Sequence, residues 1–360
     1  MNNNASLLVR WGLVVVGSVA LGAGLSYLHV PATWILAAIL ASGAMALGTG
    51  KELPINEHFY RFARGIIGVL AAVPLVGVPL IDALRLLPYG IAVSLVTIGI
   101  GFVGGLLLAR AQKDISPESG ILGMLSGGAS VMPAIASEIG GDMRFVALAQ
   151  YLRLVAVSMT LPVVSGLMTM PNELGQEAAG ALEDPAATQS PWWTILIVVA
   201  IALIGDPVGR RLHIPVPSVF VPLLLTVAVS LVLPEDVTLS PPMPLQVLAF
   251  MSIGWACGGA LSVPALKAFA KNLPATIAFI IAVMAACALT AWPLVGLLDI
   301  TYFEAYLATS PGALETVLAL SAEGGAGHEV IALQLIRLVM VLLVAGWLPQ
   351  LIRLITRRRG

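Results

Sequence analysis

The chain carries the same pattern twice, about 184 residues apart. Each copy has a short break containing Ser and Gly, then a Gly-Gly pair, and then Gln-x-x-Arg on an apolar stretch. These features lie at 126–128, 140–141 and 150–153 in the first copy, and at 310–312, 324–325 and 334–337 in the second. The shift indicates an internal duplication in which each half is one structural unit. Two matching apolar halves with glycine-rich breaks at corresponding places are typical of secondary transporters.

The composition predicts a protein embedded in a membrane. Hydrophobic residues fill 59% of the 360 positions and charged residues 10%, whereas soluble domains carry roughly 25% charged residues. A spanning helix needs about 20 mostly apolar residues. Apolar stretches lie near 7–28, 31–48, 62–82, 86–109, 119–140 and 143–170, and again near 191–209, 214–233, 245–266, 273–296, 302–323 and 328–352. We therefore expect an all-α polytopic membrane protein, with repeat 1 at 1–170, an acidic linker at 171–190 and repeat 2 at 191–360.

Lysine and arginine in short loops mark the cytoplasmic side. If every stretch crossed the membrane, Arg144 would lie outside and the linker 171–190, which has acidic but no basic residues, would lie inside. The rule holds if 119–140 instead enters and leaves on the cytoplasmic side. Each repeat then has five transmembrane helices plus one broken or re-entrant helix, so that the repeats are inverted, the linker is extracytoplasmic and both termini are cytoplasmic. A rival arrangement keeps 119–140 as a crossing, discontinuous helix and makes another stretch partial.

The two breaks are the first candidate site. Glycine inside a helix costs about 1 kcal/mol relative to alanine, and irregular backbone at membrane depth is tolerated only against protein or a wet cavity. One interpretation is close helix packing through small residues. The recurrence of the break, with a proline in the second copy, favours a substrate site where the two segments meet. Its residues would be Ser126, Gly127, Gly128 and Ser130 from the first half and Ser310, Pro311 and Gly312 from the second.

The Gln-x-x-Arg pairs, Gln150 with Arg153 and Gln334 with Arg337, form the second candidate site. Residues three apart share one helix face, and each arginine lies about 15 Å into its span, near the bilayer centre. A buried arginine there needs a partner or water. The two guanidinium groups would bind an anionic substrate or hold the broken segments in register. The alternative is a structural ion pair with Glu138, Glu315 or Glu323.

Glu315 follows the second break by three residues. A carboxylate near the start of a helix can cap exposed amides, which is the simpler role. In a cavity it could instead titrate or bind a cation, because burial and a neighbouring arginine shift its proton affinity in opposite directions. Its counterpart in the first half is Val131, so such a role would be asymmetric.

The sequence gives little support to enzymatic or nucleic-acid chemistry. Its four histidines and two cysteines, Cys257 and Cys287, have no metal-ligand spacing. No Walker-type nucleotide loop is present. A net charge of −1 with short basic loops offers no extended footprint for nucleic acid. We expect no enzyme, no cofactor, no metal and no nucleic-acid partner.

With these motifs in view, the chain resembles the bacterial AbrB membrane protein family, which is also labelled ammonia monooxygenase and is unrelated to the small DNA-binding regulator of the same name. The resemblance covers nearly the whole chain. It is carried in each copy by the small-Gly break, the Gly pair and Val-x-x-x-Gln-x-x-Arg, at 146–153 and 330–337. The acidic residue after the Gly pair is present as Asp142 but replaced by Ala326 in the second copy. More remotely, the family is similar to cation/proton antiporters and to bile-acid-type and auxin-type carriers, whose broken helices lie in a mobile core.

The residues and the resemblance together predict a secondary transporter in the bacterial inner membrane that moves a small, anionic solute by alternating access. The family's label of regulating gene expression supplies the alternative, a membrane-embedded sensor or regulator without transport. A sensor needs a cytoplasmic output surface, and this chain offers only short loops and an arginine-rich tail. The expected partners are the lipid bilayer and a small-molecule or ion substrate. A homodimer would suit a mobile core that works against a fixed scaffold.

Overall fold

The computed structural model describes residues 3–27, 33–125, 131–167, 191–214, 216–234, 237–261, 267, 270–312 and 314–357. The regular structure in these ranges is entirely helical. The predicted linker 171–190 and the break residues Ser126, Gly127, Gly128 and Ser130 lie outside them. Inside helices, the side chains of Glu138, Glu315 and Glu323 are also outside the description.

The helices of the two halves follow the same order. The first half has α1 (Asn3–Tyr27), α2 (Thr33–Thr49), α3 (Glu57–Ala72), the 3-10 turn η1 (Val73–Leu75), α4 (Leu80–Arg85), α5 (Leu87–Ala111), α6 (Pro117–Met124), α7 (Val131–Ile139) and α8 (Met143–Leu167). The second half has α10 (Trp193–Arg211), α11 (Pro217–Ser230), α12 (Met243–Gly259), α14 (Leu273–Leu298), α15 (Tyr302–Thr309), α16 (Leu314–Glu323) and α17 (His328–Arg357). Both predicted broken stretches, 119–140 and 302–323, are indeed split into two short helices.

The stretch predicted at 62–82 is not one helix. It ends as α3 at Ala72, continues as the 3-10 turn η1 and resumes as α4. The sequence there contains Pro74 and Pro79 around Gly77. Proline lacks the amide that a continuing helix requires, and Gly77 has a φ of 82° in the left-handed region, which stops the helix.

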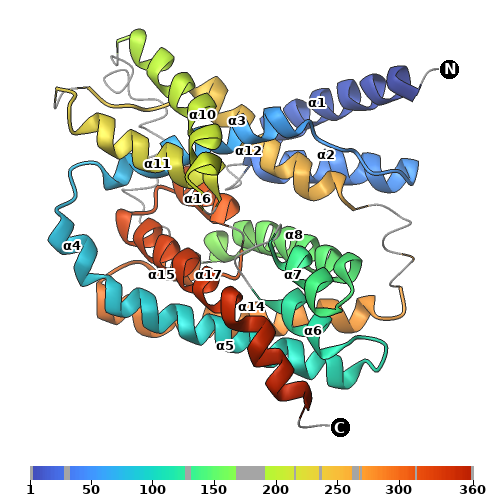
Figure 1. Cartoon of the computed structure of the whole chain (residues 1–360). Helices are drawn as coiled ribbons and strands as arrows, with labels where there is room; N and C mark the ends of the chain where they lie inside the picture. The colour runs from blue at the N-terminus through green and yellow to red at the C-terminus, as the bar shows by residue number, and fades with distance from the viewer. Residues whose placement is uncertain are drawn as a thin grey trace.

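The helices form two groups (Figure 1). The first bundle consists of α1, α2, α3, α10, α11 and α12. The second bundle consists of α5, α6, α7, α8, α14, α15 and α17. Helix α16, the second half-helix of the second split stretch, packs mainly on α3 of the first bundle and also contacts α17. The bundles also contact each other where α8 packs on α2 and α12. Each bundle therefore takes corresponding helices from both halves of the chain.

Within the first bundle the halves exchange helices. Helix α3 packs on α10 and α11 of the second half, and α12 packs on α2 of the first. The contact of α12 with α2 is very close, because a Cβ atom added at Gly254 would lie 2.4 Å from the Ile35 carbonyl oxygen and one at Gly258 would lie 2.4 Å from the Ile39 carbonyl oxygen. Small residues four apart permit such an approach between membrane helices. The halves are repeated units of sequence, but in the described residues they do not pack as two separate domains.

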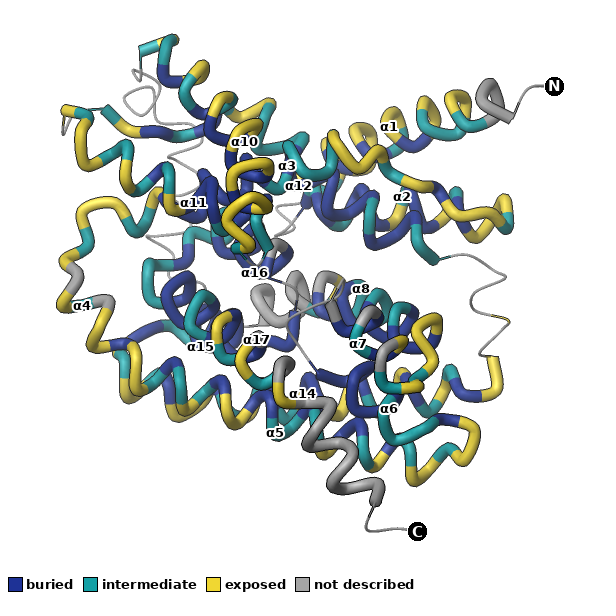
Figure 2. Tube along the Cα trace, in the orientation of Figure 1, coloured by how far each residue is buried: buried dark blue, intermediate teal, exposed yellow. Residues whose placement is uncertain are grey.

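Four helices are long and apolar enough to cross a membrane, by length and composition. They are Leu7–Tyr27, Leu87–Ala111, Trp193–Arg211 and Leu273–Leu298. These are α1 and α5 of the first half and α10 and α14 of the second. Large apolar side chains are exposed along them, including Leu8, Val103, Leu203 and Leu289, and Figure 2 shows the exposed residues on the outer sides of these helices. Such an exposed apolar surface suits lipid.

Candidate functional site

Each split stretch forms a hairpin whose two ends lie together. At the first hairpin, the Ser119 hydroxyl near the start of α6 accepts a hydrogen bond from the Asp142 amide just before α8, at 2.8 Å. At the second, a Glu304 carboxylate oxygen near the start of α15 accepts from the Gly327 amide just before α17, also at 2.8 Å. The chain therefore enters and leaves each hairpin at one place. The first half-helix of each hairpin ends away from that place, at Met124 in α6 and at Thr309 in α15.

The turns that follow the two hairpins show which residues of the two copies correspond, and they correct the correspondence inferred from the sequence. Gly140 and Gly325 occupy the left-handed region, with φ of 85° and 66°. The next amides, of Gly141 and Ala326, donate to the carbonyls five residues earlier. Asp142 therefore corresponds to Gly327, and the pairing of Asp142 with Ala326 was one residue out of register. The second copy still has no acidic residue at this position.

Both hairpins begin with a capped helix. The Ser116 hydroxyl accepts from the Ser119 amide at 3.2 Å at the start of α6. At the start of α15, Thr301 and Glu304 form a reciprocal capping box, with bonds of 3.2 and 2.9 Å. Side-chain caps of this kind satisfy amides that have no partner within the helix. They fix where each half-helix starts, and hence where its last carbonyls lie.

The first break is capped by Gln150 and Arg153 of α8. The Gln150 amide nitrogen donates to the carbonyls of Leu122 and Leu125, at 2.7 and 3.0 Å. Arg153 Nη1 donates to the carbonyls of Met124 and Leu125, at 3.2 and 2.9 Å. Arg153 Nη2 donates to the Gln150 side-chain oxygen at 2.6 Å, which ties the pair together. The last carbonyls of α6, which a helix leaves without partners, are bound by two side chains of one helix face.

The second break repeats the arrangement with Gln334 and Arg337 of α17. Gln334 donates to the carbonyls of Leu307 and Ala308, at 2.5 and 3.3 Å. Arg337 donates to the carbonyl of Ser310 and, at 3.2 Å, to that of Gly312. The same side-chain types at the same spacing therefore bind the C-terminal end of a half-helix in each copy.

The electrostatics of this capping are favourable. The C-terminal end of a helix carries roughly half a negative charge, so a guanidinium group there is partly neutralised without a carboxylate. Arg153 and Arg337 are only 1% and 2% exposed, and in a membrane such burial requires partners of this kind. Among the side-chain atoms of the two Gln-Arg pairs, Arg153 Nε and the Gln334 side-chain oxygen are buried without a hydrogen bond.

The two capping arginines lie near each other. Arg153 interacts electrostatically with Arg337, and both interact with the Cys287 thiol of α14. A Cβ atom added at Gly312 would lie 3.5 Å from the side chain of Val157 on α8. Cys287 was not among the predicted site residues, and nothing in one sequence could have placed it beside the two arginines. The structure brings Arg153, Arg337, Ser310, Pro311 and Gly312 into one buried region.

The hydrogen bonds of both arginines go to carbonyls of the broken segments, as expected of side chains that hold these segments in register. Binding of a substrate anion stays a prediction. The alternative ion pairs with Glu138, Glu315 and Glu323 fall on side chains outside the described part, and so does the predicted capping or cation-binding role of Glu315. Its backbone lies in the first turn of α16.

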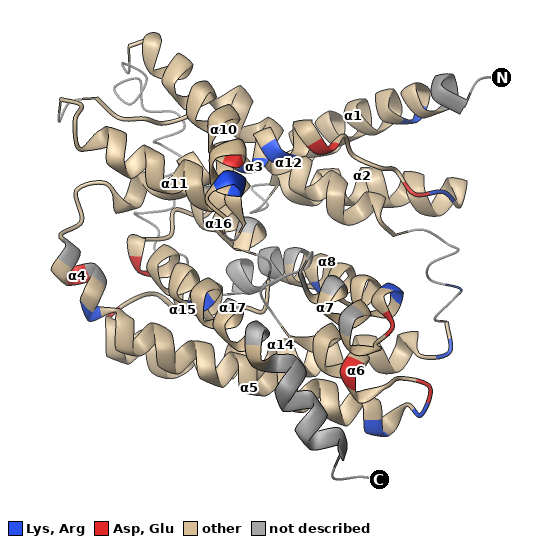
Figure 3. Ribbon diagram, in the orientation of Figure 1, with Lys and Arg blue, Asp and Glu red and all other residues tan. Residues whose placement is uncertain are grey.

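Asp206 of α10 is a buried charged group that was not among the predicted site residues. Its side chain is only 10% exposed and pairs with Arg210 and, at 3.5 Å, with Arg61 of α3. Figure 3 shows acidic and basic residues together on α10. The Arg61 contact joins the two halves of the chain. The spacing of Asp206 and Arg210, one helical turn apart, was the only signal available.

The structure has two cavities of note among the residues that it describes. One, of about 180 Å³, lies at the base of the first hairpin and is lined by Asp114, Ile115, Ser116, Ser119, Gly140, Asp142, Phe145 and Asn272. The other, of about 490 Å³, lies beyond the end of α11 and is mostly apolar, with Val73, Leu231, Leu233 and Leu239 in its wall. Within the part of the chain that the structure describes, no group of three or more His, Cys, Asp or Glu side chains is placed to hold a metal ion.

The chain is similar to known proteins over nearly its whole length. A family model described as "Transition state regulatory protein AbrB" matches residues 5–356. A protein of Escherichia coli (strain K12) that is named as a regulator, AbrB, is 30% identical over 353 residues. The match covers 98% of this chain and 99% of that relative. Both similarities extend across the two halves and both hairpins.

Proposed function

Because the chain belongs to the AbrB family of membrane proteins, we propose that it is a secondary-transporter-like protein that moves a small, anionic solute across the bacterial inner membrane by alternating access. The observation that carries this proposal is that Arg153 and Arg337 are both buried, bind the ends of the half-helices α6 and α15, and lie within electrostatic reach of each other. Paired discontinuous helices near the middle of a membrane are the usual place for a transported substrate.

The hairpins also support inverted repeats. A hairpin that starts and ends at one place does not cross the membrane. If the other five apolar stretches of each half do cross, each half makes an odd number of crossings. The proposal is five crossings and one re-entrant hairpin per half, with the boundaries 1–170 and 191–360. The basic residues then place both termini in the cytoplasm and the acidic linker outside. The two hairpin tips approach each other from opposite faces.

An anion is the substrate class that the charges favour. Two guanidinium groups lie within electrostatic reach of each other, and helix carbonyls neutralise each of them only in part. A small carboxylate or another anion at the hairpin tips would offset the remaining positive charge. Arg153 Nε, which is buried and without a hydrogen bond, is a donor that such a ligand could use.

The two bundles supply the moving parts. The second bundle holds the first hairpin and α15 of the second hairpin, while α16 of the second hairpin packs mainly on α3 of the first bundle. Alternating access would move the second bundle against the first, which would act as the scaffold. A scaffold is held in place most simply by a second copy, so a homodimer through the first bundle belongs to the proposal. Native mass spectrometry of the detergent-purified protein measures that stoichiometry.

Transport is tested in two steps. A thermal-shift screen of small organic and inorganic anions identifies a ligand, because a compound that binds the native form raises its apparent stability. Proteoliposomes are then loaded with the unlabelled ligand, and uptake of the labelled ligand is measured. We expect saturable counterflow in the wild type, strongly reduced counterflow in Arg337→Gln, and wild-type counterflow in Arg144→Gln, whose arginine is exposed on α8.

Three results would contradict the proposal. Non-saturating conductance without counterflow indicates a channel. Wild-type counterflow in both Arg153→Gln and Arg337→Gln excludes anion binding by these groups. The absence of flux for any ligand that stabilises the protein removes transport altogether.

A regulator without transport is the second candidate, because the E. coli relative is named as a regulator. The two functions separate in cells. If the protein regulates without transporting, a variant without flux, such as Arg337→Gln, restores the wild-type transcript profile to a deletion strain. If regulation follows from transport, the variant fails to restore it.

A further inference from the structure

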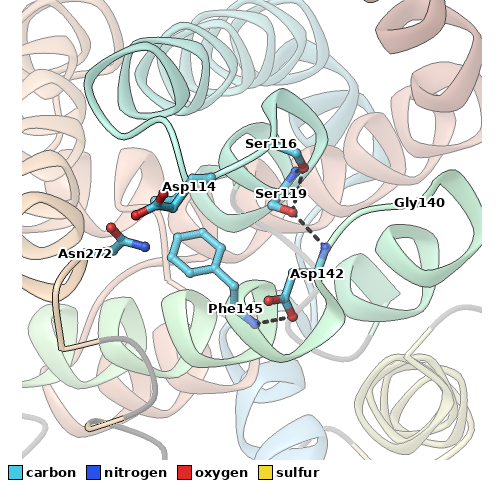
Figure 4. Close-up of a pocket in the computed structure, with 8 residues that line it drawn as sticks. Asp114, Ser116, Ser119, Gly140, Asp142, Phe145 and Asn272 are labelled. Atoms are coloured by element: carbon cyan, nitrogen blue, oxygen red, sulfur yellow. Dashed lines mark hydrogen bonds between the residues drawn. The ribbon is translucent and has the colours of Figure 1, made fainter.

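The two cavities described above differ in what they could hold. In the smaller one, the Phe145 ring separates the polar side chains, and Figure 4 shows Asp114 and Asn272 on one side of the ring and Asp142 on the other. These side chains do not converge on one ligand. The larger cavity, of about 490 Å³, is lined mainly by apolar residues and by no charged residue. Ligand pockets in proteins usually have mainly apolar walls and volumes of ~300–1,000 Å³.

The larger cavity lies where the two halves of the chain differ. In the first half, the connection 50–56 between α2 and α3 packs tightly on the end of α12. The Leu53 amide donates to the Gly259 carbonyl at 3.0 Å, and a Cβ atom added at Gly259 would lie 2.7 Å from the Leu53 carbonyl oxygen. The corresponding connection of the second half, 231–242 between α11 and α12, is longer. Residues of this connection line the cavity together with residues of η1, at the end of α3.

The cavity lies at the level of an exposed tryptophan. A Cβ atom added at Gly205 of α10 would lie 2.4 Å from the side chain of Pro222 on α11, and one added at Gly209 would lie 2.6 Å from that of Pro217. Later residues of α10 therefore meet earlier residues of α11, so the two helices are antiparallel and the end of α11 lies beside the start of α10. Trp192, at that start, is 75% exposed. Exposed tryptophans are enriched at the interface between membrane and water, which places the cavity at this interface.

The cavity opens onto an exposed apolar surface. Leu231, directly after α11, lines the cavity and is 77% exposed, and Val76, which also lines it, is 42% exposed. Leu224 lies seven residues before Leu231, on the same face of the helix, and is 46% exposed. The apolar surface along α11 is therefore continuous with the mouth of the cavity. An exposed apolar surface of a membrane helix faces lipid.

These features favour the acyl chain of a phospholipid as the occupant. The lining offers no charge to bind an ion, and a largely apolar space gives water few polar partners. An acyl chain is apolar over its whole length, and the mouth of the cavity lies where lipid chains already surround the protein. The adjacent interface, marked by Trp192, is the level at which a lipid head group lies.

We propose that this cavity binds the acyl chain of a membrane phospholipid, with the head group at the level of Trp192. The site does not depend on the transport proposal, since none of its lining residues belongs to the hairpins or to the helices that cap them. The bound chain would fill the space between η1 of the first half and the connection 231–242 of the second. It would thereby join the two halves at one edge of the first bundle.

The first test is photo-crosslinking of the full-length protein in liposomes that contain a phospholipid with a diazirine group on its acyl chain. Mass spectrometry then identifies the labelled residues. Leu239 lines the cavity and is only 3% exposed, so lipid that merely surrounds the protein does not reach it. We expect labelling of Leu239 in the wild type and its loss in Val237→Trp, whose larger side chain fills the cavity. Val232→Trp is the matched control, because Val232 belongs to the same connection, is 87% exposed and does not line the cavity.

Native mass spectrometry of the detergent-purified protein gives a second readout. The wild type and Val232→Trp should retain a phospholipid that Val237→Trp loses. Val73→Trp, in η1, fills the same cavity from the other element and should also lose the lipid, so that the test does not depend on the folding of one variant. Equal lipid retention in the filled variants and the wild type overturns the proposal. Labelling of exposed Leu224 without labelling of Leu239 also overturns it, and leaves the cavity to water or to another part of the chain.

Discussion

At the scale of single residues, two long polar side chains take the place of a continuing helix. Gln150 and Arg153 lie on one face of α8 and bind the last carbonyls of α6, and Gln334 and Arg337 do the same for α15. The sequence predicted this pairing in part, because a spacing of three residues places both side chains on one face. It left open whether they meet a substrate, a carboxylate or the backbone. That choice depends on where the break lies in space, which periodicity does not define.

The cap formed by Arg153 should be measurable as stability. Arg153→Gln removes the donor that Arg153 supplies to the buried Met124 carbonyl, while the Leu125 carbonyl still accepts from Gln150. Leaving one buried carbonyl without a partner costs about 1–3 kcal/mol. We expect a clear fall in the Tm of the detergent-purified protein. Arg144→Gln is the matched control, because Arg144 is exposed on the same helix and exposed substitutions usually change stability by less than about 0.5 kcal/mol. Equal Tm values for the two variants would show that the cap contributes nothing.

At the scale of elements, α6 and α15 are too short to be stable alone, since isolated helices shorter than about 12 residues are marginal in water. Packing supplies the stability. Helix α6 lies so close to α5 that a Cβ atom added at Gly105 would lie 2.4 Å from the Gly120 carbonyl oxygen. The sequence showed that both regions are rich in glycine, but it did not show that these glycines face each other. The first hairpin is thereby joined to a long apolar helix and should move with it.

This close contact predicts that a Gly→Ala substitution has opposite effects on stability at two positions of α5. Gly105→Ala forces backbone apart, and such overpacking costs about 1–3 kcal/mol. Gly99→Ala meets nothing within 4 Å, and alanine in a helix is favoured over glycine by up to about 1 kcal/mol. We expect the first variant to lower the Tm and the second to keep or raise it. If Gly105→Ala is as stable as Gly99→Ala, the hairpin is not held by this contact.

At the scale of the whole molecule, duplication predicted the order of helices but not their exchange between halves. The packing of α3 on α10 and the pairing of Asp206 with Arg61 join residues far apart in the chain. One sequence contains no information about which distant residues are neighbours. The hydrophobic pattern of the sequence predicts which face of each helix is buried. Which other helix covers that face depends on packing in three dimensions. The membrane character and the split stretches were therefore predictable, and the interleaved first bundle was not.

The inverted arrangement makes a prediction about the two hairpin bases. Lys113 precedes the first hairpin, Asp299 precedes the second, and both are exposed. If the halves are inverted, the two positions lie on opposite sides of the membrane. A membrane-impermeant maleimide applied to intact cells should label Asp299→Cys but not Lys113→Cys, and opening the cells should make Lys113→Cys reactive. Both native cysteines are buried, so the wild type supplies the unlabelled control.

Labelling of both positions from outside would mean that the hairpins start at one face. Tips that approach from one face do not form a pocket closed alternately to each side, and alternating access between them would then have no structural basis.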